Sequence, residues 1–123
     1  MATLTEGRVT AAYILSEASG MRSRDHAKVA SGAGNVEPGA ILGKVTASGK
    51  YVPHAPAATD GSETAVAILY SAVDATSADA PCVITARDSE VKKDELIYNA
   101  ATDTQGEKDA VHASLAANGI IVR

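Results

Sequence analysis

The absence of both phenylalanine and tryptophan from this chain of 123 residues constrains its core more than any other feature. The only aromatic residues are Tyr13, Tyr51, Tyr70 and Tyr98. Packing must therefore come from Val, Ile, Leu and many Ala, which are compact and often β-branched. Because large aromatic side chains usually supply much of a core's buried area, we expect one small domain with a thin core. Such a domain would gain stability from burial shared with a partner.

Apolar runs of strand length follow the Pro38-Gly39 turn. Residues 64–70 are the strongest predicted strand, because both alternating faces are apolar, as in a central strand covered on each side. Further strands are predicted at residues 40–46, 51–52, 81–87 and 95–98. Residues 53–56 carry two prolines and predict a loop, which the turn at 59–62 extends. The charged residues 88–94 predict a connection.

One helix is predicted near the C-terminus. Thr104 and Glu107 have the spacing of a capping box, in which side chains satisfy free N–H groups of the first turn. Asn118-Gly119 supplies the helix end, and residues 120–123 predict a last strand. The fold class is therefore mainly β (α+β): a compact small β-rich domain with one short C-terminal helix and an extended N-terminal arm.

Residues 1–36 differ in character from the rest. Gly and Ser clusters and scattered charges surround a single apolar group at residues 11–15. Ordering such a segment costs conformational entropy that little apolar burial offsets. We therefore expect a flexible N-terminal arm over residues 1–36 and a globular β-rich domain over residues 37–123. In the alternative, the same residues form the first strands of the domain.

Charge and cysteine content limit the classes of partner and compartment. A formal net charge of −4 argues against a nucleic-acid or anionic-membrane binder. The single cysteine, Cys82, lies in an apolar run and is expected to be a buried small hydrophobe in a chain compatible with a reducing cytoplasm. No basic segment followed by an apolar stretch begins the chain, and no run of 18 apolar residues occurs, so neither a secretory signal nor a membrane span is expected.

No motif points to catalysis. The segment 43–50 has one residue too many for a phosphate-binding loop, and a tyrosine stands where Ser or Thr is needed. The three histidines lack metal-ligand spacing, and no nucleophile elbow is present. Asp60 and Glu63 are adjacent acids in a glycine turn, which favours local hydrogen bonding over acid–base chemistry. We expect a protein that is not an enzyme and takes no cofactor, no metal and no small-molecule substrate.

Several stretches resemble a known family. Residues 39–45, residues 49–51 and the sequence 57–69, in which an Ala-Thr-Asp-Gly turn leads into an Ala-Val-Ala-Ile-Leu strand, are similar to the lambda-type head decoration proteins of tailed bacteriophages. The helix followed by residues 119–123 is similar as well. The resemblance covers about 85 residues, counted from Pro38 to the end of the chain. It implies a homotrimer that is synthesised in the bacterial host cytoplasm and binds the outer surface of the virion capsid. There it would occupy three-fold and quasi-three-fold sites of the expanded head and cement neighbouring capsomers of the major capsid protein.

Two surfaces are candidates for this role. An arm can bind by adding a strand to a sheet edge of the capsid protein, which makes little demand on sequence. The candidate strand comprises Thr10, Ala11, Ala12, Tyr13, Ile14 and Leu15. A loop with His54, Thr59, Asp60 and Gly61 is the candidate for a trimer or capsid interface.

Two other classes of function remain open. A non-viral β-rich ligand-binding module is the main alternative, although the lack of Trp for ligand stacking disfavours it. A small hydrolase is the third, and the sequence offers no nucleophile–base pair for it.

Overall fold

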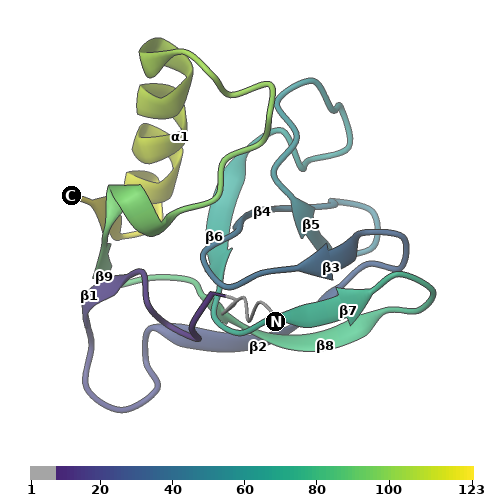
Figure 1. Ribbon diagram of the computed structural model, residues 1–123, viewed down its shortest axis with the longest axis horizontal. Coiled ribbons are helices and arrows are strands. Elements are labelled where there is room, and N and C mark those ends of the chain that lie inside the picture. Colours follow the sequence, from purple (N-terminus) through teal and green to yellow (C-terminus); the bar gives the residue numbers. More distant parts are fainter. Residues whose placement is uncertain (1–7) are drawn as a thin grey trace, which may run out of the picture.

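The computed structural model describes residues 8–123, which contain ten strands, one 3-10 helix and one α-helix (Figure 1). The strands are β1 (Ile14–Glu17), β2 (Arg24–Val29), β3 (Gly34–Val36), β4 (Ile41–Lys44), β5 (Tyr51–Pro53), β6 (Ala65–Leu69), β7 (Val73–Ala75), β8 (Ala80–Thr85), β9 (Ser89–Val91) and β10 (Ile120–Val122). The 3-10 helix η1 spans Lys93–Glu95 and the helix α1 spans Gln105–Ala117. The predicted mainly β class with one short C-terminal helix is confirmed.

Five strands close into a barrel in the order β2-β5-β4-β6-β8. Its longest pairing joins β2 and β8 in antiparallel register from Arg24↔Thr85 to Val29↔Ala80. The strands predicted at residues 40–46 and 51–52 correspond to β4 and β5, which form a hairpin paired from Leu42↔Pro53 to Lys44↔Tyr51. Two smaller sheets attach to the barrel: β1-β9-β10 at one end and β3-β7 at the other.

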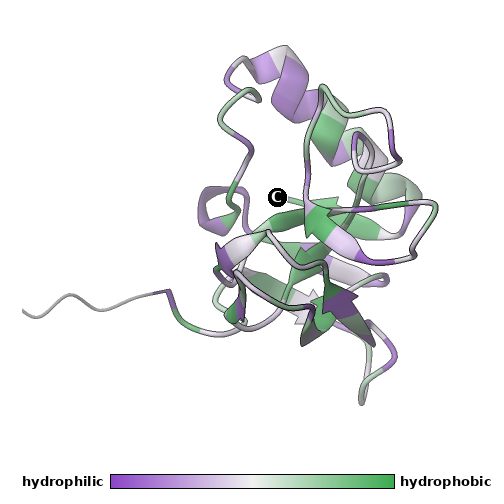
Figure 2. Cartoon of the chain, turned by 90° about the vertical axis from the view of Figure 1, so that its right-hand side faces the viewer, coloured by the Kyte–Doolittle hydropathy of each residue, from purple (hydrophilic) through white to green (hydrophobic). Residues whose placement is uncertain are grey.

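The core has two parts, with β6 between them. Ala67 and Leu69 belong to the barrel cluster, and Ala65 and Ile68 belong to the cluster under helix α1. The prediction that both faces of this strand are covered is therefore confirmed. The barrel cluster is completed by Val29, Val36, Ala40, Leu42, Ala75, Ala80, Cys82 and Ile84, and the helix cluster by Tyr13, Ile41, Val91, Leu96, Val111, Leu115 and Ile120. Figure 2 shows hydrophobic residues gathered on the central strands and hydrophilic residues on the outer part of α1.

Helix α1 begins and ends where the sequence predicts. The Thr104 side chain accepts a hydrogen bond from Glu107 N at 3.2 Å, and Glu107 Oε2 accepts one from Asp103 N at 3.1 Å. Two free donors at the helix start are thereby satisfied. Asn118 caps the other end, and Gly119 follows with φ +81°. Val111 and Leu115 are the buried residues of the helix.

The N-terminal region differs from the arm predicted for residues 1–36. Residues 1–7 lie outside the described residues, and residues 14–36 form β1, β2 and β3 within the fold. The alternative, in which these residues supply the first strands of the domain, matches the structure. The Gly and Ser clusters are tight turns between short strands, as Gly20 (φ +68°) and Gly32 (φ +93°) show. Burial of Val29 and six residue pairs with β8 offset the entropy cost that suggested a free arm.

Two shorter segments also differ from the prediction. The charged residues 88–94 contain β9, which pairs with β1 and in parallel with β10. Residues 95–98, predicted as a strand, contribute only an isolated bridge between Ile97 and Ala40. The sequence did not predict β9 because charged residues surround its two buried residues, Ser89 and Val91, and the Glu90 between them faces solvent.

Candidate functional site

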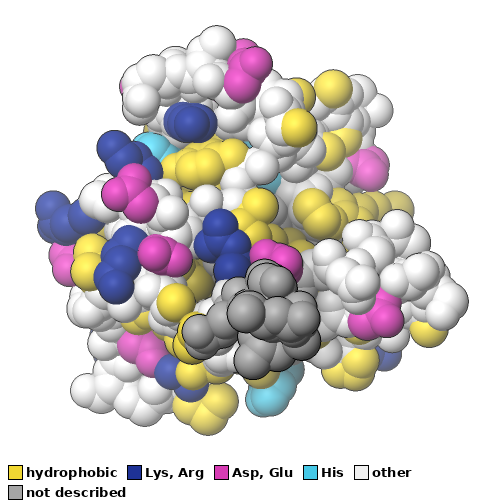
Figure 3. All heavy atoms as spheres, viewed as in Figure 1, with side chains coloured by type: hydrophobic (Ala, Val, Ile, Leu, Met, Phe, Trp, Pro, Cys, Tyr) yellow, Lys and Arg dark blue, Asp and Glu magenta, His cyan; other side chains and the backbone are white. Residues whose placement is uncertain are grey.

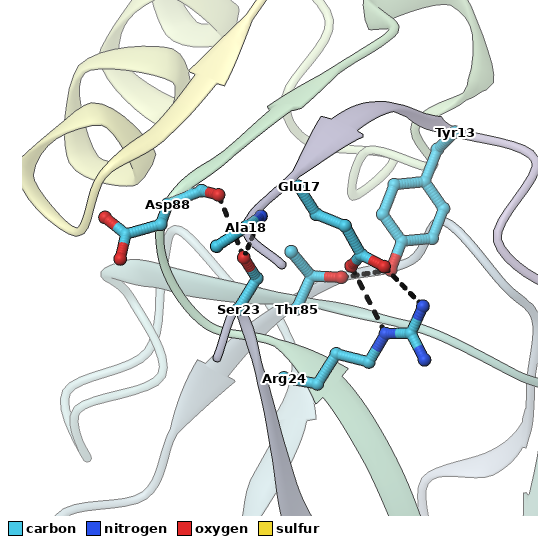
Figure 4. A network of polar contacts seen from close by, with 7 residues as sticks. All are labelled: Tyr13, Glu17, Ala18, Ser23, Arg24, Thr85 and Asp88. Carbon is cyan, nitrogen blue, oxygen red and sulfur yellow. Dashed lines mark hydrogen bonds and ion pairs between the residues drawn. The ribbon is translucent and has the colours of Figure 1, made fainter. Parts of the chain in front are cut away.

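The N-terminal segment of the described chain is fastened to the domain through Tyr13. This side chain is 1% exposed, and its hydroxyl forms a 2.6 Å hydrogen bond with Thr85 Oγ1 (Figure 4). Burial raises the pKa of Tyr13 well above its usual range. The main chain is held as well, because Ala11 N donates to Tyr70 O at 3.1 Å and Lys92 N donates to Tyr13 O at 2.7 Å. Tyr13 is thus a core residue and not a free arm residue.

A half-buried ion pair lies beside this tyrosine. Arg24 on β2 pairs with Glu17 at the end of β1, and the Arg24 guanidinium lies 4.3 Å from the ring centroid of Tyr70. The hydrogen bond to Glu17 raises the pKa of Arg24. Ser23, fully buried, accepts from Ala18 N and donates to Asp88 O, both at 2.9 Å (Figure 4). Together these contacts hold the turn between β1 and β2 against the residue that precedes strand β9.

The candidate strand 10–15 is therefore divided between surface and interior. Thr10 is exposed and Leu15 is 48% exposed, whereas Tyr13 is buried and Ala11, Ala12 and Ile14 are partly buried. Ala11 has φ +62°, where the chain turns before β1. Strand β1 is at the end of its sheet, with β9 as its one neighbour in the described chain. The other edge of β1 pairs with no strand of the described residues.

The candidate loop has an exposed tip and a buried base. Thr59 and Asp60 are exposed, and His54 is 5% exposed with its Nε2 donating to Glu63 O at 2.9 Å. Asp60 Oδ1 accepts from Ser62 N and Ser62 Oγ, and these bonds lower the pKa of Asp60. Thr59 and Asp60 are thus accessible at the surface, whereas His54 is buried and its hydrogen bond joins the two ends of the loop.

Glycine is required where this loop crosses the barrel. Gly61 has φ +108°, and a Cβ there would lie 2.4 Å from Thr46 Oγ1. A Cβ on Gly43 of β4 would lie 2.4 Å from the main-chain oxygen of Ser62. The loop therefore lies directly on the barrel, and its tip has a fixed position.

An apolar pocket of about 260 Å³ lies beside the base of this loop, where His54 is among its lining residues. Its walls come from β3, the start of β4, Pro53 and residues 97–99, and it includes Val36, Ile41 and Ile97. Figure 3 shows hydrophobic side chains in the middle of this face, between helix α1 and the β3–β7 sheet. Sequence reasoning missed this pocket because its walls come from segments distant in the chain.

The structure also bears on metal sites and membrane spans within residues 8–123. This part of the chain has no group of three or more His, Cys, Asp or Glu residues arranged to hold a metal ion. No helix found there combines the length and apolar character needed to cross a bilayer. Cys82 is buried, as predicted, and burial raises the pKa of its thiol.

The fold and these surfaces define a small β-barrel protein with an edge strand, an exposed loop tip and an apolar surface pocket. Residues 3–120 match the family model described as bacteriophage lambda head decoration protein D. The chain therefore belongs to this family of phage head decoration proteins, which are structural proteins of the capsid, and the predicted family is confirmed. A search of curated proteins found no match.

Proposed function

We propose that this protein binds as a homotrimer to three-fold and quasi-three-fold sites on the outer surface of the expanded phage head. There it cements neighbouring copies of the major capsid protein and stabilises the shell against the pressure of packaged DNA. Synthesis takes place in the bacterial host cytoplasm before docking. The match of residues 3–120 to the head decoration family carries this proposal.

Exposed apolar surface supports association with other proteins. Val9, Leu15, Met21 and Ile121 are 57%, 48%, 58% and 40% exposed, and the apolar pocket beside β3 is open on the surface. Apolar surface that is left uncovered in a monomer is commonly covered in an assembly. A chain with four tyrosines and no phenylalanine or tryptophan would also gain from burial at subunit contacts.

The N-terminal segment is proposed to contact the capsid protein through residues 10–15 and the free edge of β1. Main-chain pairing at an edge supplies affinity with little demand on sequence. Leu15 is the most exposed apolar side chain of this segment. Three such segments on one trimer would raise the effective concentration, adding on the order of 10² to 10⁴ in avidity.

The loop with Thr59, Asp60 and Gly61, supported by His54, is proposed to contact either a second subunit or the capsid protein. Its tip is exposed and its position is fixed by the close approach of Gly61 to Thr46. A fixed loop loses little conformational entropy when it binds.

Sedimentation with capsid shells tests this function. The pure protein is expected to have the mass of a trimer by light scattering and to pellet with expanded shells but not with unexpanded ones. Because Tyr13 belongs to the core, the arm is tested by Leu15→Lys and not by deletion of residues 1–16. Ala113→Lys is the matched control, since Ala113 is exposed on helix α1, the change introduces the same charge, and the residue lies outside the segment. Failure of the wild-type protein to bind expanded shells would refute the function, and normal binding by Leu15→Lys would refute the role of the segment.

A further inference from the structure

One end of the barrel carries a hollow of about 360 Å³ that is distinct from the surfaces considered above. Because β4 and β8 run antiparallel to their barrel neighbours, β2, β5 and β6 begin toward this end, and β4 and β8 finish toward it. We call the hollow the barrel mouth. Its lining includes Asp25 near the start of β2, Lys44 at the end of β4, Tyr51 at the start of β5, Val66 near the start of β6, and Ala86 and Arg87 after β8.

The barrel mouth continues the inner surface of the barrel. Leu42 belongs to the barrel cluster, and Lys44, two residues later on β4, shares its face. Tyr51 packs against the same cluster and pairs directly with Lys44 across the two strands. The Lys44 Nζ accordingly lies 5.9 Å from the centroid of the Tyr51 ring. Val66 and Ala86 also pack against the barrel cluster, so the mouth has an apolar side next to its charged groups.

Charge in the barrel mouth is unbalanced. Arg87 pairs with Asp25 and also donates through Nη1 to Arg22 O at 2.7 Å, which holds its guanidinium at the rim. Both groups act on Tyr51, since burial raises the pKa of this tyrosine, the Asp25 carboxylate raises the pKa further and Arg87 lowers it. Lys44 forms no ion pair within residues 8–123. Two cations against one carboxylate give the lining a formal charge of +1, although the formal net charge of the chain is −4.

We propose that the barrel mouth binds the carboxylate of a glutamate side chain on a partner protein. The Lys44 ammonium can donate charge-assisted hydrogen bonds to a carboxylate, and the guanidinium of Arg87 has five N–H donors, more than its present bonds use. Val66 and Ala86 offer apolar contact to the methylene groups of such a side chain. Asp25 disfavours a doubly charged phosphate, because its carboxylate repels the second negative charge. The identity of the partner as a protein of the phage shell rests on the proposed function; recognition of a carboxylate does not.

The barrel mouth can be tested directly with N-acetyl-glutamate α-amide as the probe. In NMR titrations of the full chain we expect saturable shifts at the amides of Lys44, Tyr51 and Arg87, with a dissociation constant on the order of 1–10 mM. N-acetyl-glutamine amide has the same shape without the charge and should bind at least about threefold more weakly. Inorganic phosphate should also bind more weakly than the glutamate probe. The absence of saturable shifts at the mouth, equal binding of the glutamine probe, or tighter binding of phosphate would each overturn the proposal.

Lys44→Met separates binding from folding, because methionine keeps an unbranched apolar stem and removes the charge. Binding of the glutamate probe should weaken by about threefold to tenfold. Lys28→Met is the matched control, since Lys28 is an exposed strand residue that forms no ion pair in the described chain and lies outside the barrel mouth. Both variants should melt at the temperature of the wild-type protein, because both side chains are exposed. Unchanged binding by Lys44→Met, or an equal loss in both variants, would overturn the proposal, and the comparison of the two probes on the wild-type protein needs no variant.

A second arm of the experiment identifies the source of the glutamate. If it comes from the shell, Lys44→Met should reduce sedimentation with expanded shells while Lys28→Met does not, and both variants should keep the wild-type mass by light scattering. Normal shell binding by Lys44→Met, or a loss of mass in that variant alone, would overturn the assignment to a shell protein. Failure of the wild-type protein to bind shells would instead refute the proposed function, and the NMR titration would still decide whether the barrel mouth binds a carboxylate.

Discussion

The hydroxyl of Tyr13 lies 2.6 Å from Thr85 Oγ1 in the protein interior, joining the segment before β1 to the last residue of β8 across 72 positions of sequence. Both side chains are at most 1% exposed. The bond fastens the start of the described chain to the barrel. It therefore makes the N-terminal segment part of the domain's stability.

Replacing Tyr13 with Phe should lower the free energy of unfolding by about 1–3 kcal/mol, because Thr85 Oγ1 is left buried without a partner. Urea denaturation measures this change. The double variant Tyr13→Phe/Thr85→Val should lose less stability than the sum of the two single variants. Strict additivity would contradict a direct bond between the hydroxyls.

Stability should fall as the pH rises above 10. Burial raises the pKa of Tyr13 above its ordinary value of 10.0 and raises the pKa of Tyr98 to about 12. Unfolded tyrosines ionise near pH 10, whereas the buried tyrosines stay protonated, so above pH 10 the native state binds more protons than the unfolded state. The free energy of unfolding therefore falls as the pH rises above 10. Below pH 10 the stabilising contribution of the two tyrosines is fully present. The expected loss is up to about 1.4 kcal/mol per pH unit for each tyrosine. Urea titrations at about pH 9, 10 and 11 test this, and Tyr13→Phe should have a shallower dependence; an equal slope would contradict the assignment.

Gly43→Ala should destabilise the protein by about 3 kcal/mol or more, since the new Cβ would lie 2.4 Å from Ser62 O and force the loop off the barrel. Gly106→Ala is the control. It lies in the first turn of α1 with nothing within 4 Å, and should gain about 0.5–1 kcal/mol from helix propensity. Thermal melts of both variants should move in opposite directions, and a neutral Gly43→Ala would contradict the observed packing.

Cys82 should react slowly with an aromatic disulfide in the native protein. The residue is 7% exposed and burial raises the pKa of its thiol, so little thiolate is accessible. Labelling should speed up by about 10³ or more in denaturing urea, because native reaction requires opening of the barrel. Equal rates under both conditions would show that the thiol is accessible at the surface.

The sequence predicted the elements with strong local signals. The capping box of Thr104 and Glu107 and the Asn118-Gly119 end set the limits of α1, since caps act within one helical turn. The apolar faces of residues 65–69 predicted the central strand β6. The exposed Thr59 and Asp60 of the candidate loop followed from turn chemistry.

The candidate site was predicted less well, because its residues meet through contacts between distant segments. Tyr13 was assigned to a flexible arm, and its burial depends on Thr85 and on the cluster under α1, which lie far from it in the sequence. The apolar pocket beside β3 has no local signature, since separate segments of the chain supply its walls.

By itself, the sequence determined the class of the fold, the family, the capped helix and the central strand, because each depends on composition or on neighbours close in the chain. Only the tertiary structure decided that residues 14–36 belong to the domain. Their Gly- and Ser-rich turns cost entropy that local interactions do not offset. Pairing of β2 with β8 and burial of Tyr13 against Thr85 offset that cost, and these contacts exist only after the barrel has closed.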